Sequence, residues 1–477
     1  MNPLQESSAK LEGKTESIEQ QVRRLPGFFD QADWLGFWIT AGIALVAYSW
    51  TLAPEVTLER SGIFATGAAY AGVSPPPGFP LWTLYAWLFT KIFPFSNIAW
   101  RIAFSSAFAG AFCCAVISLT VSRASQLLLK RTQGWSRSSQ IQQHWLRVVC
   151  GNVAGLGFAF HNEFWGQAVI VECTALGMLL FAIALCLLLR WVCVPRQFRY
   201  LYTAVFMYGL SVAVSYTFIA AAAGLLGFVV LARPALGRDL CFTLALILPA
   251  VVIGQARGVV WEWFESLRGI YIAIAIVAGI VALDLIVKSR RLFTEWRATL
   301  LISGILLLPL SFYLTLPIAS MTNPPGNWGY ARTFEGFMHT TSRGQYEHFY
   351  PIDVFGEPSR FFMQAVGFVR ESWRAIGWPY LMPVPIPFFF LHRMRKRERN
   401  WLSGLALVFL SSSLLIMIAL NPPPDRSALS FMIQYFQFVH LLLIILSGCG
   451  LAIIAGRMSN LTSTRRVQSN QVAQVTP

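Results

Sequence analysis

The sequence predicts an all-α integral membrane protein with about twelve transmembrane helices. Of its 477 residues, 56% are hydrophobic and only 12% are charged, whereas soluble domains carry about 25% charged residues. The apolar residues form long runs, and a helix of about 20 residues crosses a bilayer. Because a backbone in hydrocarbon must satisfy its own hydrogen bonds, spans are helices or closed barrels, and continuous apolar runs favour helices. A soluble enzyme is excluded.

Twelve apolar runs are predicted as spans. They cover residues 34–53, 97–122, 146–162, 167–189, 200–214, 217–232, 240–256, 269–287, 298–320, 375–391, 400–420 and 431–455. The runs 200–214 and 217–232 are short, so one long tilted helix over both is the alternative. With the N-terminus in the cytoplasm, most of the 37 Lys and Arg residues fall in cytoplasmic segments, as the positive-inside rule expects. The sequence therefore predicts both termini in the cytoplasm.

Polar segments flank this multi-span domain, which is assigned to residues 34–456. Residues 1–33 are polar and mixed in charge, without the apolar core of a signal peptide, and are predicted to form a cytoplasmic segment. The tail 457–477 is rich in Ser, Thr, Asn and Gln and is predicted to be a disordered cytoplasmic segment.

Two long loops are predicted on the outer side, at about 54–96 and 321–374. Prolines divide the first loop at residues 75–80, which predicts two short interfacial helices joined by a proline hinge. The second loop is rich in Trp, Tyr, Phe, Arg and Glu. Long loops in compact proteins are usually functional, so we expect the two loops to roof a cavity at the outer membrane face.

The net charge of +15 does not indicate a nucleic-acid partner, because the basic residues cluster between apolar runs where they orient the spans. Membrane lipids, including anionic lipids, are the expected partners of this charge. The eight cysteines lie within or beside apolar runs and are expected to be small buried hydrophobes. His161 and His440 match no metal-ligand spacing, and no Walker or Rossmann glycine motif occurs, so neither a metal nor a cofactor is expected.

Four separated motifs follow one another along the chain. They are LAPEVTLERSG at 52–62 with GV at 72–73 and PPGFPL at 76–81; FWGQAVIVE at 164–172; NWG at 327–329 with TFEGF at 333–337 and RGQY at 343–346; and NPP at 421–423 with Asp425 and QYF at 434–436. In this order the motifs resemble a large bacterial family of membrane proteins described as protein O-mannosyltransferase-like, within the GT-C glycosyltransferase superfamily. The resemblance covers residues 35–450.

The resemblance implies a GT-C-like fold and a location in the bacterial inner (cytoplasmic) membrane. It implies transfer of a sugar, with mannose as one candidate, from a polyprenyl-phosphate donor to a protein or envelope glycan acceptor on the outer face. An acidic residue of the first outer loop would act as general base on the acceptor hydroxyl. Arginines would stabilise the charge that develops on the departing lipid phosphate.

The chain departs from the family pattern in the first outer loop. The family typically reads Asp-Ser-Gly-Glu, whereas this chain has Arg60-Ser61-Gly62-Ile63, so both acidic positions are lost and one has become basic. Pro75 replaces the family's His before Pro-Pro-Gly. Residues 214–216 are Val, Ser and Tyr where the family often has Asn and His before a Thr. The acidic residue that would act as general base in the family is therefore missing at its usual position in this chain.

Glu59 is the first candidate for a relocated base, because it precedes the lost acidic position directly. On a helix, a shift of one residue rotates a side chain by about 100°, so replacement is not automatic. Glu55 is the second candidate. The alternative for Glu59 is an exposed loop carboxylate paired with Arg60.

Eight further residues of the motifs are candidates for substrate binding. They are Arg60, Gln167, Glu172, Asn327, Trp328, Arg332, Glu335 and Arg343. Glu172 is predicted inside the fourth span, where an ionisable side chain is costly and is by default functional; a hydrogen bond to a neighbouring helix is the alternative. Arg332 and Arg343 are candidates for phosphate contact or for ordinary loop solvation. Trp328 either belongs to a tight turn that covers the cavity or is an aromatic residue at the membrane interface.

Two other functions remain open. A catalytically silent family member would bind a lipid-linked substrate or a partner protein without catalysing transfer, and the lost acidic positions motivate this alternative. A lipid or sugar transporter would also have many spans. Transporters often contain internal repeats and broken helices at the midplane, and no internal repeat is evident in this sequence.

Overall fold

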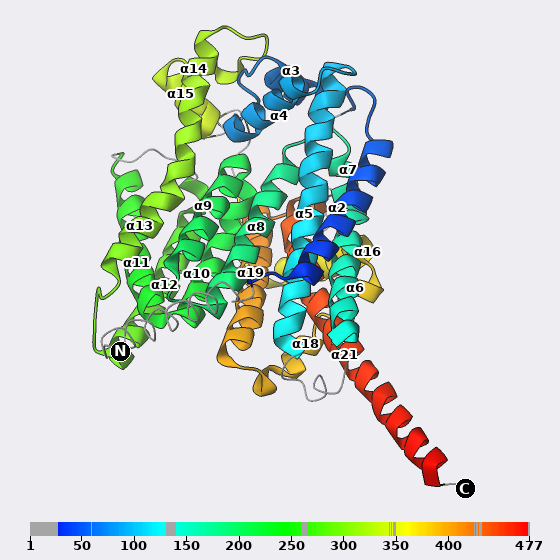
Figure 1. Cartoon of the computed structure of the whole chain (residues 1–477). Helices are drawn as coiled ribbons and strands as arrows, with labels where there is room; N and C mark the ends of the chain where they lie inside the picture. The colour runs from blue at the N-terminus through cyan, green and yellow to red at the C-terminus, as the bar shows by residue number, and fades with distance from the viewer. Residues whose placement is uncertain are drawn as a thin grey trace, which may run out of the picture.

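The computed structural model describes residues 27–58, 60–129, 140–258, 265–342, 344, 346, 350–423, 425, 428 and 432–475. Within these residues every regular element is a helix, and the one β-bridge joins Val73 and Asn327. Figure 1 shows a bundle of long helices with the short helices α3, α4, α14 and α15 gathered at one end, which we call the loop end. The predicted all-α class is confirmed.

Eight helices of the described residues are long and apolar enough to cross a membrane. They are α2 (Gln31–Trp50), α5 (Ile98–Leu129), α8 (Thr174–Cys193), α11 (Pro234–Ala256), α12 (Arg268–Ser289), the run Trp296–Met321 made of α13, η4 and α14, α19 (Lys396–Leu420), and the run Ile433–Ser459 made of η7 and the start of α21. Each overlaps a predicted span. A multi-pass membrane protein is therefore supported, whereas the count of twelve stays a prediction.

Three further helices overlap predicted spans. They are α6 (Gln140–Ala159), α9 (Phe198–Val214) and the run Tyr216–Ala232 made of η2 (Tyr216–Ala221) and α10 (Ala222–Ala232). Ser215 separates the last two because its backbone is extended (φ −151°, ψ 127°). The alternative of one long tilted helix over this pair is therefore wrong.

The core of the bundle is formed by α5 and α21 (Gln437–Val475). In both, 83% of the most apolar window is buried, against 17% in α12 at the periphery. Small residues allow α5 and α6 to approach closely: a Cβ added at Gly151 would lie 2.7 Å from the Ser118 carbonyl, and one at Gly155 would lie 2.7 Å from that of Cys114. The described cysteines are all free, and all but Cys193 are buried, as predicted for small hydrophobes.

The predicted span at 375–391 is wrong as a continuous helix. The amphipathic helix α16 (Pro358–Ile376) ends at Gly377, whose φ is +83°. The chain then forms only α17 (Trp378–Leu381), α18 (Ile386–Phe389) and η6 (Leu391–Arg393). The cause is proline at positions 379, 383, 385 and 387, because each proline removes a backbone donor and clashes with the preceding helical turn.

This broken segment packs against the core helices, as irregular backbone at membrane depth requires. The ring of Tyr380 occupies the space above Gly157 of α6, and its hydroxyl donates to the Val153 carbonyl (3.3 Å). A Cβ added at Gly450 of α21 would lie 2.0 Å from the Pro383 carbonyl oxygen. Glycine at these two helix positions therefore makes room for the broken segment.

We expect Gly450→Ala to destabilise the protein by about 1–3 kcal/mol, the usual cost of overpacking a tight core. The clash is with backbone, which cannot rotate away. Thermal unfolding in detergent measures the effect. Gly42→Ala is the matched control, since an added Cβ there has nothing within 4 Å and the greater helix propensity of Ala should leave stability equal or slightly higher. Equal melting temperatures for Gly450→Ala and the unsubstituted protein would contradict this packing.

The last helix, α21, continues to Val475. The disorder predicted for the segment 457–477 stays a prediction. Neither Gly nor Pro occurs between Met458 and Thr476, so no residue there breaks the helix that leaves the bundle. Residues 1–26 of the predicted N-terminal segment lie outside the described residues.

A buried ion cluster joins α2, α5 and α6 at the end opposite the loop end. Arg147 of α6 pairs with Asp30 (2.7 Å) and with Asp33, and Ser122 of α5 donates to Asp33 (2.6 Å). The side chains of Arg147 and Asp33 are 5% and 0% exposed. Asp30 also caps α2, because it accepts from the backbone N–H groups of Ala32 and Asp33. The cluster therefore fixes how three helices meet.

Candidate functional site

The first predicted outer loop folds into two short helices, α3 (Ser61–Ala69) and α4 (Pro80–Ile92), as expected. Phe64 of α3 packs edge-on against Trp82 of α4, with ring centroids 5.1 Å apart. Both rings are fully buried. Ser74, in the linker, shares a hydrogen bond with Thr83 of α4 (3.1 Å). This packing holds the start of α3, and with it Arg60, against the bundle.

Arg60 pairs with Glu172, which joins the first and second sequence motifs. One guanidinium nitrogen of Arg60 lies 3.9 Å from Glu172 Oε2, and the two side chains are 50% and 6% exposed. At this distance the contact is an ion pair and not a hydrogen bond. The guanidinium also lies over the Phe64 ring, 5.6 Å from its centroid. Arg60 thus presents N–H donors to solvent, whereas the carboxylate lies behind it.

The prediction that Glu172 lies inside the fourth span is wrong. Glu172 lies in the turn between α7 (Asn162–Ala168) and α8. Its Oε1 accepts from the Cys173 backbone N–H (3.0 Å), and its carbonyl accepts from the Ser106 hydroxyl of α5 (2.9 Å). The sequence did not indicate this turn because apolar residues continue from α7 across it into α8. A carboxylate directly before a helix start is favoured by the helix dipole, so its position has a local cause.

The Glu172 carboxylate supplies the negative charge beside Arg60. Burial, the largest single influence, lowers the pKa of Arg60, but the Glu172 carboxylate, followed by Cys173, Tyr435 and Tyr346, raises it above the ordinary value. Arg60 therefore stays charged. Tyr346 and Tyr435 belong to the third and fourth motifs, so residues of the three other motifs lie within electrostatic reach of this guanidinium of the first motif.

The third motif ties the two loops together. Val73 and Asn327 form a parallel bridge, in which the Val73 N–H donates to the Gly326 carbonyl (3.0 Å) and the Trp328 N–H to the Val73 carbonyl (3.4 Å). The Asn327 side chain accepts from the Ser320 hydroxyl (2.8 Å). The half-buried Trp328 packs beside Tyr313 and Leu316. Asn327 and Trp328 therefore hold the loop in place and do not meet Glu172.

The remaining predicted residues are placed individually. Arg332 is exposed and donates to Asn323 (2.9 Å), Glu335 is exposed in the first turn of α15 (Phe334–Thr341), Glu55 is exposed, and Gln167 of α7 is half-buried. Within the described residues, these four side chains form no hydrogen bond or ion pair with one another. Glu59 and Arg343 lie outside the described residues, so the roles proposed for them stay predictions.

The fourth motif connects α19 to the second loop. Asn421 ends α19 in the left-handed region (φ 41°) and donates to the Tyr350 carbonyl (2.9 Å). Gln364 of α16 donates to the Asn421 side chain (3.0 Å) and to the Pro422 carbonyl (2.7 Å). A pocket beside Gln364, bounded also by Glu371 of α16, has a volume of about 10 Å³. This is room for about one water, so this pocket is too small for the sugar that the predicted cavity was expected to hold.

A buried hydrogen-bond chain was not predicted. His161 Nε2 lies 3.1 Å from His440 Nδ1, and His440 Nε2 lies 3.1 Å from the Ser372 hydroxyl. The Phe164 N–H donates to His161 Nδ1 (3.3 Å), so the proton of a neutral His161 is on Nε2 and points at His440. His440 then carries its own proton toward Ser372 and cannot act as its base. The chain clamps α7, α16 and α21, and no sequence spacing indicates it.

Comparison with known proteins finds a family model that matches part of the chain. Residues 61–235 match the family model described as the Protein O-mannosyl-transferase TMEM260 N-terminal domain. This region contains α3, α4 and Glu172. An O-mannosyltransferase-like family is supported.

Two relatives carry the same description. The chain is 28% identical over 143 residues to Protein O-mannosyl-transferase tmem260 of Dictyostelium discoideum, a match that covers 28% of this chain and 15% of the relative. It is 36% identical over 87 residues to Protein O-mannosyl-transferase TMEM260 of Mus musculus, covering 18% of this chain and 12% of the relative. Each match therefore covers only a small part of the relative's length. A match of this extent does not show that the chain has the relative's activity. The bacterial source and the GT-C assignment stay predictions.

Proposed function

We propose that the protein is a GT-C-like membrane glycosyltransferase of the O-mannosyltransferase type. It transfers a sugar from a lipid-linked phosphate donor to a hydroxyl of a protein acceptor at the loop end, which faces the outer side of the membrane. The names of the relatives support a glycosyltransferase acting on proteins. The observation that carries the proposal is the Arg60–Glu172 pair, because it brings one cation of the first motif and one carboxylate of the second motif together.

The half-exposed Arg60 binds the donor phosphate. Its guanidinium contacts Glu172 at 3.9 Å without a hydrogen bond, so a phosphate that accepts two charge-assisted hydrogen bonds is a stronger partner than the carboxylate. When Arg60 turns to the phosphate, the Oε2 oxygen of Glu172 is released. The phosphate and the free carboxylate then lie on either side of one arginine.

Glu172 acts as the general base of the transfer. The acceptor hydroxyl gives its proton to Glu172 Oε2, and its oxygen forms the new bond to the anomeric carbon. The bond between that carbon and the phosphate oxygen breaks, and the lipid phosphate leaves with both bonding electrons. Arg60 stabilises its charge. The Cys173 N–H and the Ser106 hydroxyl hold the Glu172 turn in place, so the base is positioned before substrate binds.

The test is transfer from a radiolabelled polyprenyl-phosphate mannose to Ser/Thr peptides by the purified protein in lipid. We expect transfer, and we expect Arg60→Gln to raise the donor KM by about 10- to 100-fold, the loss of a hydrogen bond to a charged group. The matched control is Arg291→Gln, an exposed arginine between α12 and α13 that lies outside all four motifs. An equal KM for Arg60→Gln and the unsubstituted protein would remove Arg60 from the donor site.

A second candidate function is supported by the same pair. Arg60 replaces an acidic residue of the family pattern and neutralises the one buried carboxylate that the described residues bring to it. A catalytically silent protein that binds the lipid-linked donor would keep this pair. Binding of the donor without transfer to any acceptor is the outcome that selects this function.

A further inference from the structure

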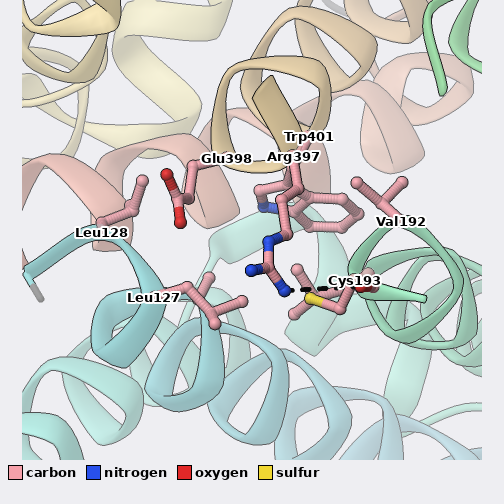
Figure 2. A pocket seen from close by; sticks show the side chains of 9 residues that line it. Leu127, Leu128, Val192, Cys193, Arg397, Glu398 and Trp401 are labelled. Atoms are coloured by element: carbon pink, nitrogen blue, oxygen red, sulfur yellow. Dashed lines mark hydrogen bonds between the residues drawn. The ribbon is translucent and has the colours of Figure 1, made fainter. Parts of the chain in front are cut away.

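A pocket lies at the opposite end of the bundle from the proposed active site, between α5, α8 and α19. Figure 2 shows its walls. They are Leu127 and Leu128 of α5, Val192 of α8, and Arg397, Glu398 and Trp401 of α19. The leucine and valine side chains form one apolar side, and three polar groups of a single helix turn form the other. This is the composition expected where a lipid headgroup meets its acyl chains.

The pocket contains one charge of each sign. Arg397 is exposed, and within the described part of the chain it donates a long hydrogen bond to the Cys193 carbonyl (3.4 Å). Glu398 is 7% exposed. Its Oε2 accepts from the Arg395 backbone N–H (2.6 Å), which caps α19, and the side chain lines the pocket beside Leu128. A ligand with an anionic and a cationic group matches this pair.

The floor of the pocket contains an unpaired donor. Trp401 is 2% exposed, and its indole Nε1 has no hydrogen-bond partner among the residues that the structure describes. A buried N–H without a partner is uncommon and destabilising. The enclosed space is about 10 Å³, enough for a single oxygen-sized group. One oxygen atom of a ligand that lies across the mouth would therefore fit and would satisfy the indole.

We propose that the phosphoethanolamine headgroup of a membrane phospholipid lies across the mouth of this pocket, with one phosphate oxygen inside it. The phosphate accepts hydrogen bonds from Arg397, one of its oxygens reaches the Trp401 N–H, and the primary ammonium donates to Glu398. The leucines contact the glycerol and the first methylenes. Basic residues surround the start of α19 at positions 393, 395, 396, 397 and 399, as is typical of a helix end at headgroup depth.

The chemistry discriminates between lipids. Phosphatidylcholine has a phosphate but its quaternary ammonium has no N–H to donate to Glu398, and phosphatidylglycerol has no cation. Native mass spectrometry of the delipidated full chain with each lipid in turn measures the three affinities. We expect phosphatidylethanolamine to bind at least tenfold more tightly than either. Equal binding of the three lipids would overturn the headgroup assignment.

Two charge variants test the two halves of the headgroup. Arg397→Gln should weaken the binding of phosphatidylethanolamine by about tenfold or more, the effect of one lost charge-assisted hydrogen bond. Its control is Arg399→Gln, which changes the same net charge on an exposed residue of the same helix outside the pocket. Glu398→Gln keeps an N3 side chain that can cap α19, and it should abolish the preference over phosphatidylcholine. A preference that survives Glu398→Gln would contradict the ammonium contact.

A tryptophan variant separates lipid binding from packing. Trp401→Phe removes the unpaired N–H and keeps a ring against Phe228, 5.8 Å from it. Without lipid we expect a higher melting temperature than the unsubstituted protein, and on adding phosphatidylethanolamine a smaller stabilisation. Trp191→Phe is the control, because Trp191 is also buried with an unpaired Nε1 but does not line the pocket; it should keep the full lipid effect. A full lipid effect in Trp401→Phe would overturn the proposal.

Discussion

Replacing Glu172 with Gln is expected to lower kcat for sugar transfer by about 10²- to 10⁴-fold, the contribution of a general base. Glutamine can still accept from the Cys173 N–H through its amide oxygen, so the turn between α7 and α8 is kept. What is lost is the basic Oε2 that faces Arg60. The donor KM should change little or fall, because Arg60 no longer has a competing carboxylate. Steady-state kinetics with the lipid-linked donor measures both constants.

Two further carboxylate variants make this result specific. Glu357→Gln alters an exposed carboxylate of the second loop that lies outside the four motifs and pairs with Arg360, and it should keep kcat within about twofold, since surface substitutions usually have small effects. Glu59→Gln tests the base expected from the sequence alone. If Glu59→Gln abolishes transfer and Glu172→Gln does not, the base is Glu59 and the role of Glu172 is to hold Arg60.

Replacing Arg147 with Gln is expected to cost about 3–5 kcal/mol of unfolding free energy, the usual effect of leaving a buried charge without its partner. Asp33 is 0% exposed and keeps only the Ser122 hydroxyl and the Asp30 N–H as donors when Arg147 is removed. Because the cluster joins α2, α5 and α6, unfolding should begin there. Denaturant unfolding in detergent, followed by tryptophan fluorescence, measures the change.

The control for this prediction is an exposed ion pair of similar type. Lys288 and Asp284 pair at 2.8 Å with side chains 70% and 53% exposed, and such i,i+4 pairs contribute about 0.3–0.5 kcal/mol. Lys288→Gln should therefore have nearly the stability of the unsubstituted protein. Equal losses in the two variants would show that burial does not strengthen the Arg147 cluster.

Much of the fold could be predicted from hydrophobicity, because each long apolar run needs a helix to satisfy its backbone in a membrane. The span predicted at 375–391 failed since hydropathy weighs side chains and not backbone donors, and four prolines interrupt that apolar segment. The turn at Glu172 was missed for a related reason. The apolar residues of α7 and α8 continue across it, so composition alone does not indicate where the helix stops.

The candidate site was predicted in part. The motifs identified Arg60, Glu172, Asn327 and Trp328, and the structure brings the first two together while the other two join the loops. Their contact depends on how α3 packs against the bundle, and no local pattern encodes this packing. The His161–His440–Ser372 chain was missed because its members come from three distant segments. Long-range contacts of this kind require the folded chain.

The central claim is that Arg60 binds the donor phosphate and thereby frees Glu172. The most direct test is cryo-electron microscopy of the protein with a non-transferable polyprenyl-phosphate sugar. We predict phosphate density within hydrogen-bond distance of the Arg60 guanidinium and a separation between Arg60 and Glu172 Oε2 well beyond the 3.9 Å of the present structure. Phosphate density elsewhere, with the Arg60–Glu172 contact unchanged, would contradict the claim.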